Sequence, residues 1–388
     1  MAAEDKVLQE IEFKVKNGVK LSKEEKQILK ENSAEERAKK AKMSFGERMK
    51  AACKAESCQL MGDGEPDLFP IRDWIDTGNY LLNAQLSSNH KKGIPSGRVV
   101  QFVGDAGVGK TFLALECLKN AQKMGYFGIL YDSEMANNDR NSLKSRGIDT
   151  ENLLYIPIDT VENLKTSLLN ILEETTADDK VFIVVDSIGN LSTRKELEDS
   201  IDGSATKDMT RPAQLKALFR TCTIKAGVKN IPIIAINHVY AAMSFMGGNV
   251  VAGGGGPAYN SSIINEFTKA QEKSSDGSIT GGLITSKVTK CRTAKEKTKV
   301  KFTIDFESGL NRYSGLELFC KDEGLITGDK KGWKFAKKTG FMQDSDKVKI
   351  TPEIWDKFLD SYLGEYLHNY FAYQSIMDEL MEIEEESD

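Results

Sequence analysis

The octapeptide GDAGVGKT, at residues 104–111, fits the pattern GxxxxGK[ST] of a phosphate-binding loop at every fixed position. It follows an apolar segment expected to be a strand and opens a segment with helical periodicity, which is the setting in which such a loop binds phosphate. Backbone N–H groups surround the phosphates there, the lysine neutralises β- and γ-phosphate oxygens, and the hydroxyl binds Mg²⁺. The residues expected to hold the nucleotide are Gly104, Asp105, Ala106, Gly107, Val108, Gly109, Lys110 and Thr111, with Thr111 also a metal ligand.

Three further side chains follow apolar runs and could complete this chemistry. Asp186 ends VFIVVD (181–186) and has the position of an acid that orients Mg²⁺ through water, with a helix-capping aspartate as the alternative. Glu134, in YDSEM, is placed to polarise an attacking water as general base, although by itself it would be an exposed loop residue. His238 either senses the terminal phosphate or is an ordinary histidine. Ligands of open α/β sheets collect at the carboxyl ends of strands, where all three are expected.

Strands and helices are expected to alternate along the middle of the chain. The expected strands lie at 98–103, 127–131, 153–158 and 181–186, with a fifth ending at Asn237, and the helices at 110–124, near 140–146, after Thr160 and from Thr210. This alternation predicts an α/β fold with a mostly parallel sheet and helices on both of its faces. Two later strands, near 282–290 and 299–306, are expected to form a hairpin.

The 388 residues predict several parts. Residues 1–43 are a charged extension, read as solvated helix or as partly disordered, and 44–69 hold a helix with a Ser44 cap and a linker. The core is expected over 70–314 and a small C-terminal α+β unit over 315–375. Residues 376–388 form an acidic tail, which is either a disordered solubilising end or a competitor for basic surfaces.

Composition limits the class of protein. A hydrophobic content of 40% and a charged content of 29% are typical of soluble globular proteins. The absence of a long apolar run predicts a cytoplasmic protein without membrane contact. Three histidines and six cysteines without a CxxC pair argue against zinc and for reduced thiols. The net charge of −5 hides a segregation that suits a nucleic-acid partner, because seven of the residues 285–301 are basic and seven of 375–388 are acidic.

Several motifs beyond the phosphate-binding loop resemble the RecA-type strand-exchange recombinases, and among them most closely the UvsX type of T-even-type phages. They are YDSE (131–134), VVDSIGNLSTRKELED (184–199), KDMTR (207–211), NIPIIAINH (230–238) and KCRTAKEKTK (290–299). The resemblance spans roughly residues 70–320. It implies a RecA-type ATPase core, ATP and Mg²⁺ as cofactors, and a helical filament on single-stranded DNA. It also implies pairing and strand exchange with duplex DNA, in recombination, recombination-dependent replication and repair, inside a host cytoplasm if the protein is phage-encoded.

The resemblance also implies roles for single residues. Lys110, Thr111, Asp186 and Glu134 take the family's phosphate, metal and water-activating roles, and His238 takes that of a polar sensor linking the γ-phosphate to a DNA loop. Lys290 and Arg292 match a basic pair that reaches the ATP of the neighbouring subunit, as an arginine finger does. From the residues alone, 290–301 is a solvated basic hairpin or a patch for the phosphate backbone.

Two segments are expected to contact DNA. The stretch 239–259 corresponds to the family's second DNA-binding loop, in which Met243 and Phe245 contact bases and Gly253, Gly254, Gly255 and Gly256 let the backbone change state and approach phosphates. Its alternative is a mobile lid or linker. The first loop, near 191–209, offers Arg194, Lys195 and Lys207, with Arg211 just beyond. The unit 328–341 interleaves lysines with aromatic residues, which fits duplex capture and a small domain core equally.

One departure concerns the nucleobase. The family stacks adenine on an aromatic residue about eight positions after the catalytic glutamate, whereas DSEMANNDRNSLKSRG has none there. Arg140 is the expected substitute. The resemblance further implies that 44–57 packs on an adjacent subunit, and that a phage-type loader and a single-strand-binding protein assist. The alternatives are a hexameric RecA-core DNA helicase and a non-catalytic recombination mediator.

Overall fold

The computed structural model describes residues 11, 13–17, 19–28, 30, 43–53, 58–60, 69–135, 139–203, 210–241, 249–251, 255–273, 278–329, 331–342 and 347–373. The chain divides into two units, Met1–Pro70 and Ile71–Asp388. Among the described residues, no helix is both long enough and apolar enough to span a bilayer.

In the first unit, α3 (Phe45–Ala52) occupies the predicted segment. Its cap is the expected Ser44, whose side chain accepts a hydrogen bond from the Glu47 N–H while the Glu47 side chain accepts one from the Ser44 N–H. Phe45 and Met49 lie one turn apart on α3, with 68% and 49% of their surface exposed. The helix therefore presents an apolar stripe to its surroundings.

The second unit is built on a sheet of ten described strands. The path through nine of them is β12–β11–β10–β9–β3–β7–β6–β4–β5, and β8 pairs with β7. In chain order they are β3 (Val99–Gly104), β4 (Phe127–Asp132), β5 (Leu153–Pro157), β6 (Val181–Asp186), β7 (Ile233–Ala241), β8 (Asn249–Val251), β9 (Ile263–Lys273), β10 (Ile279–Cys291), β11 (Lys299–Asp305) and β12 (Gly309–Leu310). The central strands β9, β3, β7, β6, β4 and β5 pair in parallel, so their carboxyl ends share one edge.

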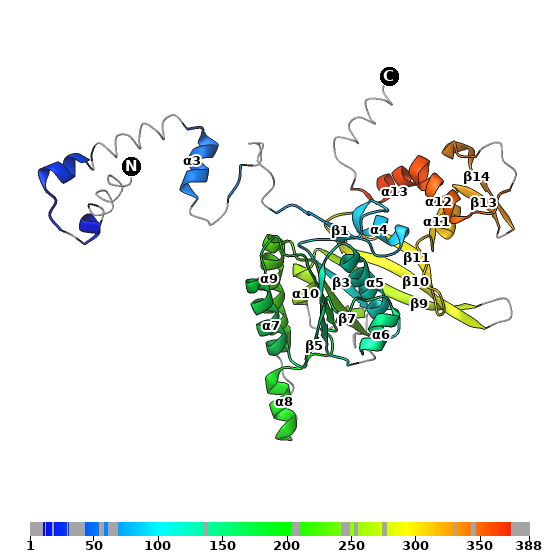
Figure 1. Ribbon diagram of the computed structural model, residues 1–388, viewed down its shortest axis with the longest axis horizontal. Helices are drawn as coiled ribbons and strands as arrows, with labels where there is room; N and C mark the ends of the chain where they lie inside the picture. The colour runs from blue at the N-terminus through cyan, green and yellow to red at the C-terminus, as the bar shows by residue number, and fades with distance from the viewer. Residues whose placement is uncertain are drawn as a thin grey trace. The chain divides into compact units, whose positions relative to one another are not determined.

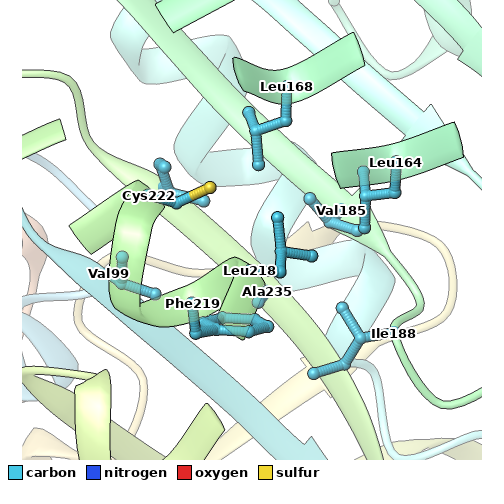
Figure 2. A pocket seen from close by; sticks show the side chains of 10 residues that line it. Val99, Leu164, Leu168, Val185, Ile188, Leu218, Phe219, Cys222 and Ala235 are labelled. Atoms are coloured by element: carbon cyan, nitrogen blue, oxygen red, sulfur yellow. The ribbon is translucent and has the colours of Figure 1, made fainter. Parts of the chain in front are cut away.

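Helices cover both faces of this sheet, as the alternation predicts (Figure 1). The helices of this part of the chain are α4 (Tyr80–Ser87), α5 (Lys110–Lys123), α6 (Arg140–Ser145), α7 (Val161–Glu174), α8 (Arg194–Ile201), α9 (Arg211–Lys229) and α10 (Gly255–Asn260). Of these, α8 projects beyond the sheet and buries none of its residues (Figure 1). The helices α4 and α5 pack on one face and α7 and α9 on the other, each side with its own hydrophobic cluster. Figure 2 shows an apolar cavity of about 10 Å³ under α7 and α9, lined by Val99, Leu168 and Cys222 among others. It has room for about one water but no polar partner for it.

The strand β9 was not expected from the sequence. It pairs with β3 in parallel and with β10 in antiparallel orientation, and therefore joins the predicted β10–β11 hairpin to the parallel sheet. The sequence does not reveal it because polar residues interrupt the apolar pattern of a buried strand. One of them, Asn265, is fully buried inside the sheet. The Ser286 hydroxyl of β10 donates a hydrogen bond to Asn265 Oδ1 at 2.8 Å, so this amide oxygen has a partner although it is buried.

The C-terminal residues form the expected mixture of helices and strands. Their elements are α11 (Leu316–Asp322), β13 (Ile326–Asp329), β14 (Gly332–Phe335), the 3₁₀ turn η1 (Lys337–Thr339), α12 (Pro352–Phe358), the π-helical turn η2 (Leu359–Leu363) and α13 (Gly364–Phe371). Trp333 and Phe335 are buried, with 4% and 8% exposed, in the hydrophobic cluster that also contains residues of α4, β10 and β11. The aromatic residues of 328–341 therefore serve as core, while Lys334 between them faces solvent.

Candidate nucleotide site

The phosphate-binding loop lies between β3 and α5, where the sequence places it. Gly104 ends β3 with φ +154°, and a side chain there would put Cβ 2.3 Å from the Phe267 carbonyl oxygen of β9. Gly107 and Gly109 also have positive φ, at 73° and 95°. Only glycine fits this path at Gly104, because the parallel neighbour strand lies against its Cα. The loop then turns so that the N-terminus of α5 faces the carboxyl edge of the sheet.

Lys110 folds back into the loop. Its Nζ donates to the carbonyl oxygens of Gly104, at 2.9 Å, and Asp105, at 2.7 Å, and only 5% of the residue is exposed. Burial lowers the pKa of Lys110, and the nearby carboxylates of Glu134 and Asp186 counter that effect. A cation held in this way is desolvated before an anion arrives, which strengthens its attraction for phosphate oxygens.

Asp186 ends β6 opposite the loop. The Thr111 hydroxyl donates to Asp186 Oδ2 at 2.7 Å, while Oδ1 is buried without a hydrogen-bond partner among the described residues. Burial raises the pKa of Asp186 to about 6, and the charge of Glu134 adds to the rise. A buried carboxylate oxygen without a donor is costly unless a cation faces it. The hydroxyl and this oxygen are hard ligands that fit Mg²⁺.

Glu134 and His238 are in direct contact. Glu134 Oε1 lies 2.9 Å from His238 Nε2 and accepts a hydrogen bond from the Ser187 hydroxyl at 3.0 Å. His238 stands on β7, and Gly189 allows its ring to approach, since a Cβ there would lie 2.8 Å from His238 Cδ2. The carboxylate that could activate water is thus bonded to the histidine from which the chain continues into residues 239–259.

Asp132 was missed by sequence reasoning. It ends β4 with 1% exposed, and its Oδ1 accepts the backbone N–H groups of Glu134, at 2.9 Å, and Met135, at 2.8 Å. The Tyr155 hydroxyl of β5 donates to Oδ2 at 3.1 Å. Asp132 therefore fixes the turn that carries Glu134, a turn in which Met135 has φ +51°. Its signal in the sequence was its place two residues before the glutamate, where an Asx turn begins.

The phosphate-binding loop and the side chains around it border one solvent-open cavity of about 350 Å³. Its lining includes Lys110, Thr111, Glu134, Asp186 and His238, so the structure brings together five of the seven residues expected to perform the chemistry, all except Lys290 and Arg292. The other lining residues are Ala106, Gly107, Gly109, Phe112, Arg146 and Ile236.

Arg146 and Phe112 are additions, and Arg140 is not among the lining residues. The role of Arg140 at the nucleobase stays a prediction. Asp139 caps α6, so Arg140 is the first residue of that helix and is exposed, whereas Arg146 follows its last turn and borders the cavity. Phe112 follows the loop threonine directly. A planar guanidinium and an aromatic ring are both suited to stacking on a nucleobase.

Lys290 and Arg292 do not line this cavity. The Lys290 Nζ donates to the carbonyl oxygens of Ala258 and Tyr259 in α10, and Arg292 is exposed, with its backbone N–H bonded to the Ser262 carbonyl at 3.1 Å. The pair thus lies away from the cavity of its own chain. A role for either residue at an ATP requires the cavity of another copy.

The residues expected at DNA are spread over several elements. Arg194 donates to Asn163 Oδ1 at 2.9 Å and Lys195 is exposed on α8. Arg211 bonds the carbonyl oxygens of Ile188 and Gly189, beside His238, and so supports the site from α9. Gly255 and Gly256 belong to α10. Lys207, Met243, Phe245, Gly253 and Gly254 lie outside the described residues.

Comparison with known proteins identifies the fold family. The RecA N-terminal domain family matches residues 54–311. A recombination and repair protein of Enterobacteria phage T4 is 33% identical over 271 residues, which cover 68% of each chain. The chain belongs to the RecA family.

A second relative agrees with this assignment. Protein RecA of Mesomycoplasma hyopneumoniae is 28% identical over 319 residues, which cover 81% of this chain and 86% of that protein. The crystal structure of the RadB recombinase aligns with a TM-score of 0.46 and 20% identity, over 62% of this chain and all of that one. The family match over residues 54–311 and the two sequence relatives confirm the family predicted from the motifs around residues 131–134, 184–199 and 230–238. Its RecA-type core contains the cavity described above.

Proposed function

We propose that this RecA-family protein is a DNA-dependent ATPase that forms a helical filament on single-stranded DNA and catalyses homologous pairing and strand exchange. The observation that carries the proposal is the hydrogen bond between Glu134 and His238 at the floor of the nucleotide cavity. It joins a general base directly to the strand that leads into the expected DNA loop. In this proposal the RecA relatives and the T4 recombination and repair protein supply the class of reaction.

The loop and Lys110 bind the phosphates of ATP. Nucleotide entry draws Lys110 Nζ from the carbonyls of Gly104 and Asp105 to the β- and γ-phosphate oxygens, which are charged acceptors and bind it more strongly. Thr111 and Asp186 would hold Mg²⁺, which neutralises charge on the phosphates when bound. Arg146 and Phe112 border the same cavity and are placed to hold the base in the absence of the family's aromatic residue.

Glu134 activates water and His238 reports the result. The Glu134 carboxylate accepts a proton from the attacking water. The turn that Asp132 fixes holds this carboxylate in position. Once Glu134 binds that water, its bond to His238 weakens, and His238 is free to turn toward the γ-phosphate. The start of the segment 239–259 therefore has two states that the nucleotide biases, which is the requirement for coupling ATP to DNA binding.

In this proposal the basic pair, half-buried Lys290 and exposed Arg292, completes the site of another copy. Arg292 is exposed and does not line the cavity of its own chain. It would steady transition-state charge on the phosphates of a neighbour's nucleotide. Hydrolysis then depends on assembly, and assembly on DNA.

The test is phosphate release by the full-length protein with and without single-stranded DNA, beside negative-stain images. We expect stimulation by DNA, open filaments, and a loss of about 10²–10³-fold in the stimulated rate for Lys110→Ala. Lys123→Ala, at the far end of α5, is the matched control and should retain the rate.

Each alternative has its own outcome. Closed rings that unwind duplex DNA would identify a helicase in place of a recombinase. Phosphate release at a background level that DNA does not stimulate, equal in wild type and Lys110→Ala, would identify a mediator without catalysis of its own.

A further inference from the structure

Lys290 holds the end of the helix that follows the glycine run. Its Nζ lies 3.0 Å from the Ala258 carbonyl oxygen and 2.9 Å from that of Tyr259, the last carbonyls before Asn260 ends α10. The final carbonyls of a helix have no N–H partner within it, and a cation there also interacts favourably with the helix dipole. Lys290 thus supplies both a donor and a charge to α10.

The sheet is shaped to aim this lysine. Along β10, buried and less buried residues alternate up to Val288, and the register with β9 then shifts between Val288 and Lys290. A shift of this kind inserts an extra residue, Thr289, and changes the direction of the side chain that follows. The irregularity places Lys290 against α10 instead of in the plain alternation of the strand.

The helix α10 is in turn joined to the nucleotide cavity. Gly256 lies so close to α9 that a Cβ would be 2.5 Å from Lys216 Cβ and 2.7 Å from its Cα. The first residue of α9, Arg211, bonds the carbonyls of Ile188 and Gly189, and Gly189 packs on the His238 ring. A movement of α10 is therefore transmitted through α9 toward His238.

Positive charge accumulates around Lys290. Arg292 is two residues away and Arg98 is near Arg292, with Glu296 as the facing carboxylate. Burial and the charge of Arg292 lower the pKa of Lys290. An arriving phosphate would relieve this repulsion, and phosphate oxygens bind an ammonium group more strongly than neutral carbonyls do.

We propose that Lys290 is a latch that positions the DNA loop: in the free subunit it holds α10 by the Ala258 and Tyr259 carbonyls, and the phosphates of a neighbour's nucleotide draw it away. One ammonium group serves both partners in turn, so binding at the subunit contact releases the C-terminal anchor of the loop. Lys290 then differs from Arg292, whose side chain makes no hydrogen bond with α10 among the described residues. The inference rests on the proposed function, because it needs a neighbour that presents phosphate.

The test compares Lys290→Met, which keeps the length but cannot donate, with Arg292→Gln, which removes a charge from the same patch. In the full chain without nucleotide or DNA, we expect hydrogen exchange of the amides in 256–262 to be about tenfold faster in Lys290→Met, the loss of roughly one charge-assisted hydrogen bond. Nucleotide-free affinity for single-stranded DNA should rise by a similar factor. Arg292→Gln should leave both at the wild-type level while lowering DNA-stimulated phosphate release.

Lys290→Arg restores donors and charge and should return the exchange to wild type. If Lys290→Met unfolds, exchange will be faster throughout β3, and Lys290→Arg then takes its place in the comparison. Slow exchange in 256–262 that requires a cationic donor at position 290 supports the latch. Equal behaviour of Lys290→Met and Arg292→Gln in exchange and in nucleotide-free binding would overturn it. Absence of DNA-stimulated hydrolysis in the wild type would instead defeat the proposed function, and the exchange comparison would stand unaffected.

Discussion

Some residues of the site lower the stability of the folded protein, and Asp186 is the clearest case. Its Oδ1 is buried without a donor among the described residues, and burial raises its pKa to about 6. The folded protein therefore favours the protonated carboxyl. That preference stabilises the fold fully below the unfolded pKa of 3.8, and the stability is lost as the pH rises through about 6.

Asp186→Asn should therefore stabilise the nucleotide-free protein at pH 8, by about 2–3 kcal/mol, because a buried charge is removed while an oxygen remains for Thr111. At pH 5 the gain should fall to roughly half, since the wild-type carboxyl is then mostly protonated. Urea unfolding of both proteins at the two pH values measures this. Asp105→Asn, an exposed neighbour, should change the unfolding free energy by less than about 0.5 kcal/mol. An Asp186→Asn protein less stable than wild type at pH 8 would contradict the argument.

The polar residues that line the site were easier to predict from the sequence than the residues that hold them in position, such as Asp132. Lys110, Asp186, Glu134 and His238 were expected at one edge, because each follows an apolar strand or its turn and parallel strands bring such ends together. The helix near 140–146 was predicted correctly, but the sequence did not show that Arg146 borders the cavity, because that depends on how α6 packs beside the sheet.

At the scale of elements, the parallel strands β3 to β7 and their helices were predictable, since apolar runs and caps mark them. Thr160, for example, caps α7 by accepting the Asn163 N–H. The strand β9 was not, because its buried Asn265 and half-buried Glu266 interrupt the apolar pattern and its partner β3 is distant in sequence. The helix α10 was equally hidden, since a run of glycines is typical of a flexible segment.

The helix α10 gives the prediction at this scale. By helix propensity alone, Gly256→Ala should stabilise it by about 1 kcal/mol. The new Cβ would meet Lys216 at 2.5 Å, so we expect destabilisation by about 1–3 kcal/mol through displacement of α10 from α9. Ala258→Gly is the control in the same helix and should cost about 1 kcal/mol without a clash. Urea unfolding decides the sign: a more stable Gly256→Ala protein would show that α10 is free to move from α9 at no cost.

At the scale of the whole molecule, the chain separates into two compact units at Pro70. The unit from Ile71 contains both hydrophobic clusters that flank the sheet, while the first contributes α3 with its exposed Phe45 and Met49. An exposed apolar stripe on a short helix gains stability when it packs against another surface. The expectation that 44–57 joins adjacent subunits follows from that stripe. The acidic tail, 376–388, lies outside the described residues.

A chain that starts at Met61 should therefore fold and bind ATP but fail to assemble. Its unfolding free energy and nucleotide affinity should match those of the full chain, because the sheet, its clusters and the cavity all lie beyond residue 70. Sedimentation with ATP and single-stranded DNA should show filaments for the full chain and small species for the truncated one. Phe45→Glu in the full chain is the sharper variant, since it places one charge on the apolar stripe of α3 and leaves Ile71–Asp388 unchanged. If Phe45→Glu sediments as the wild type does, the stripe is not the joint between subunits.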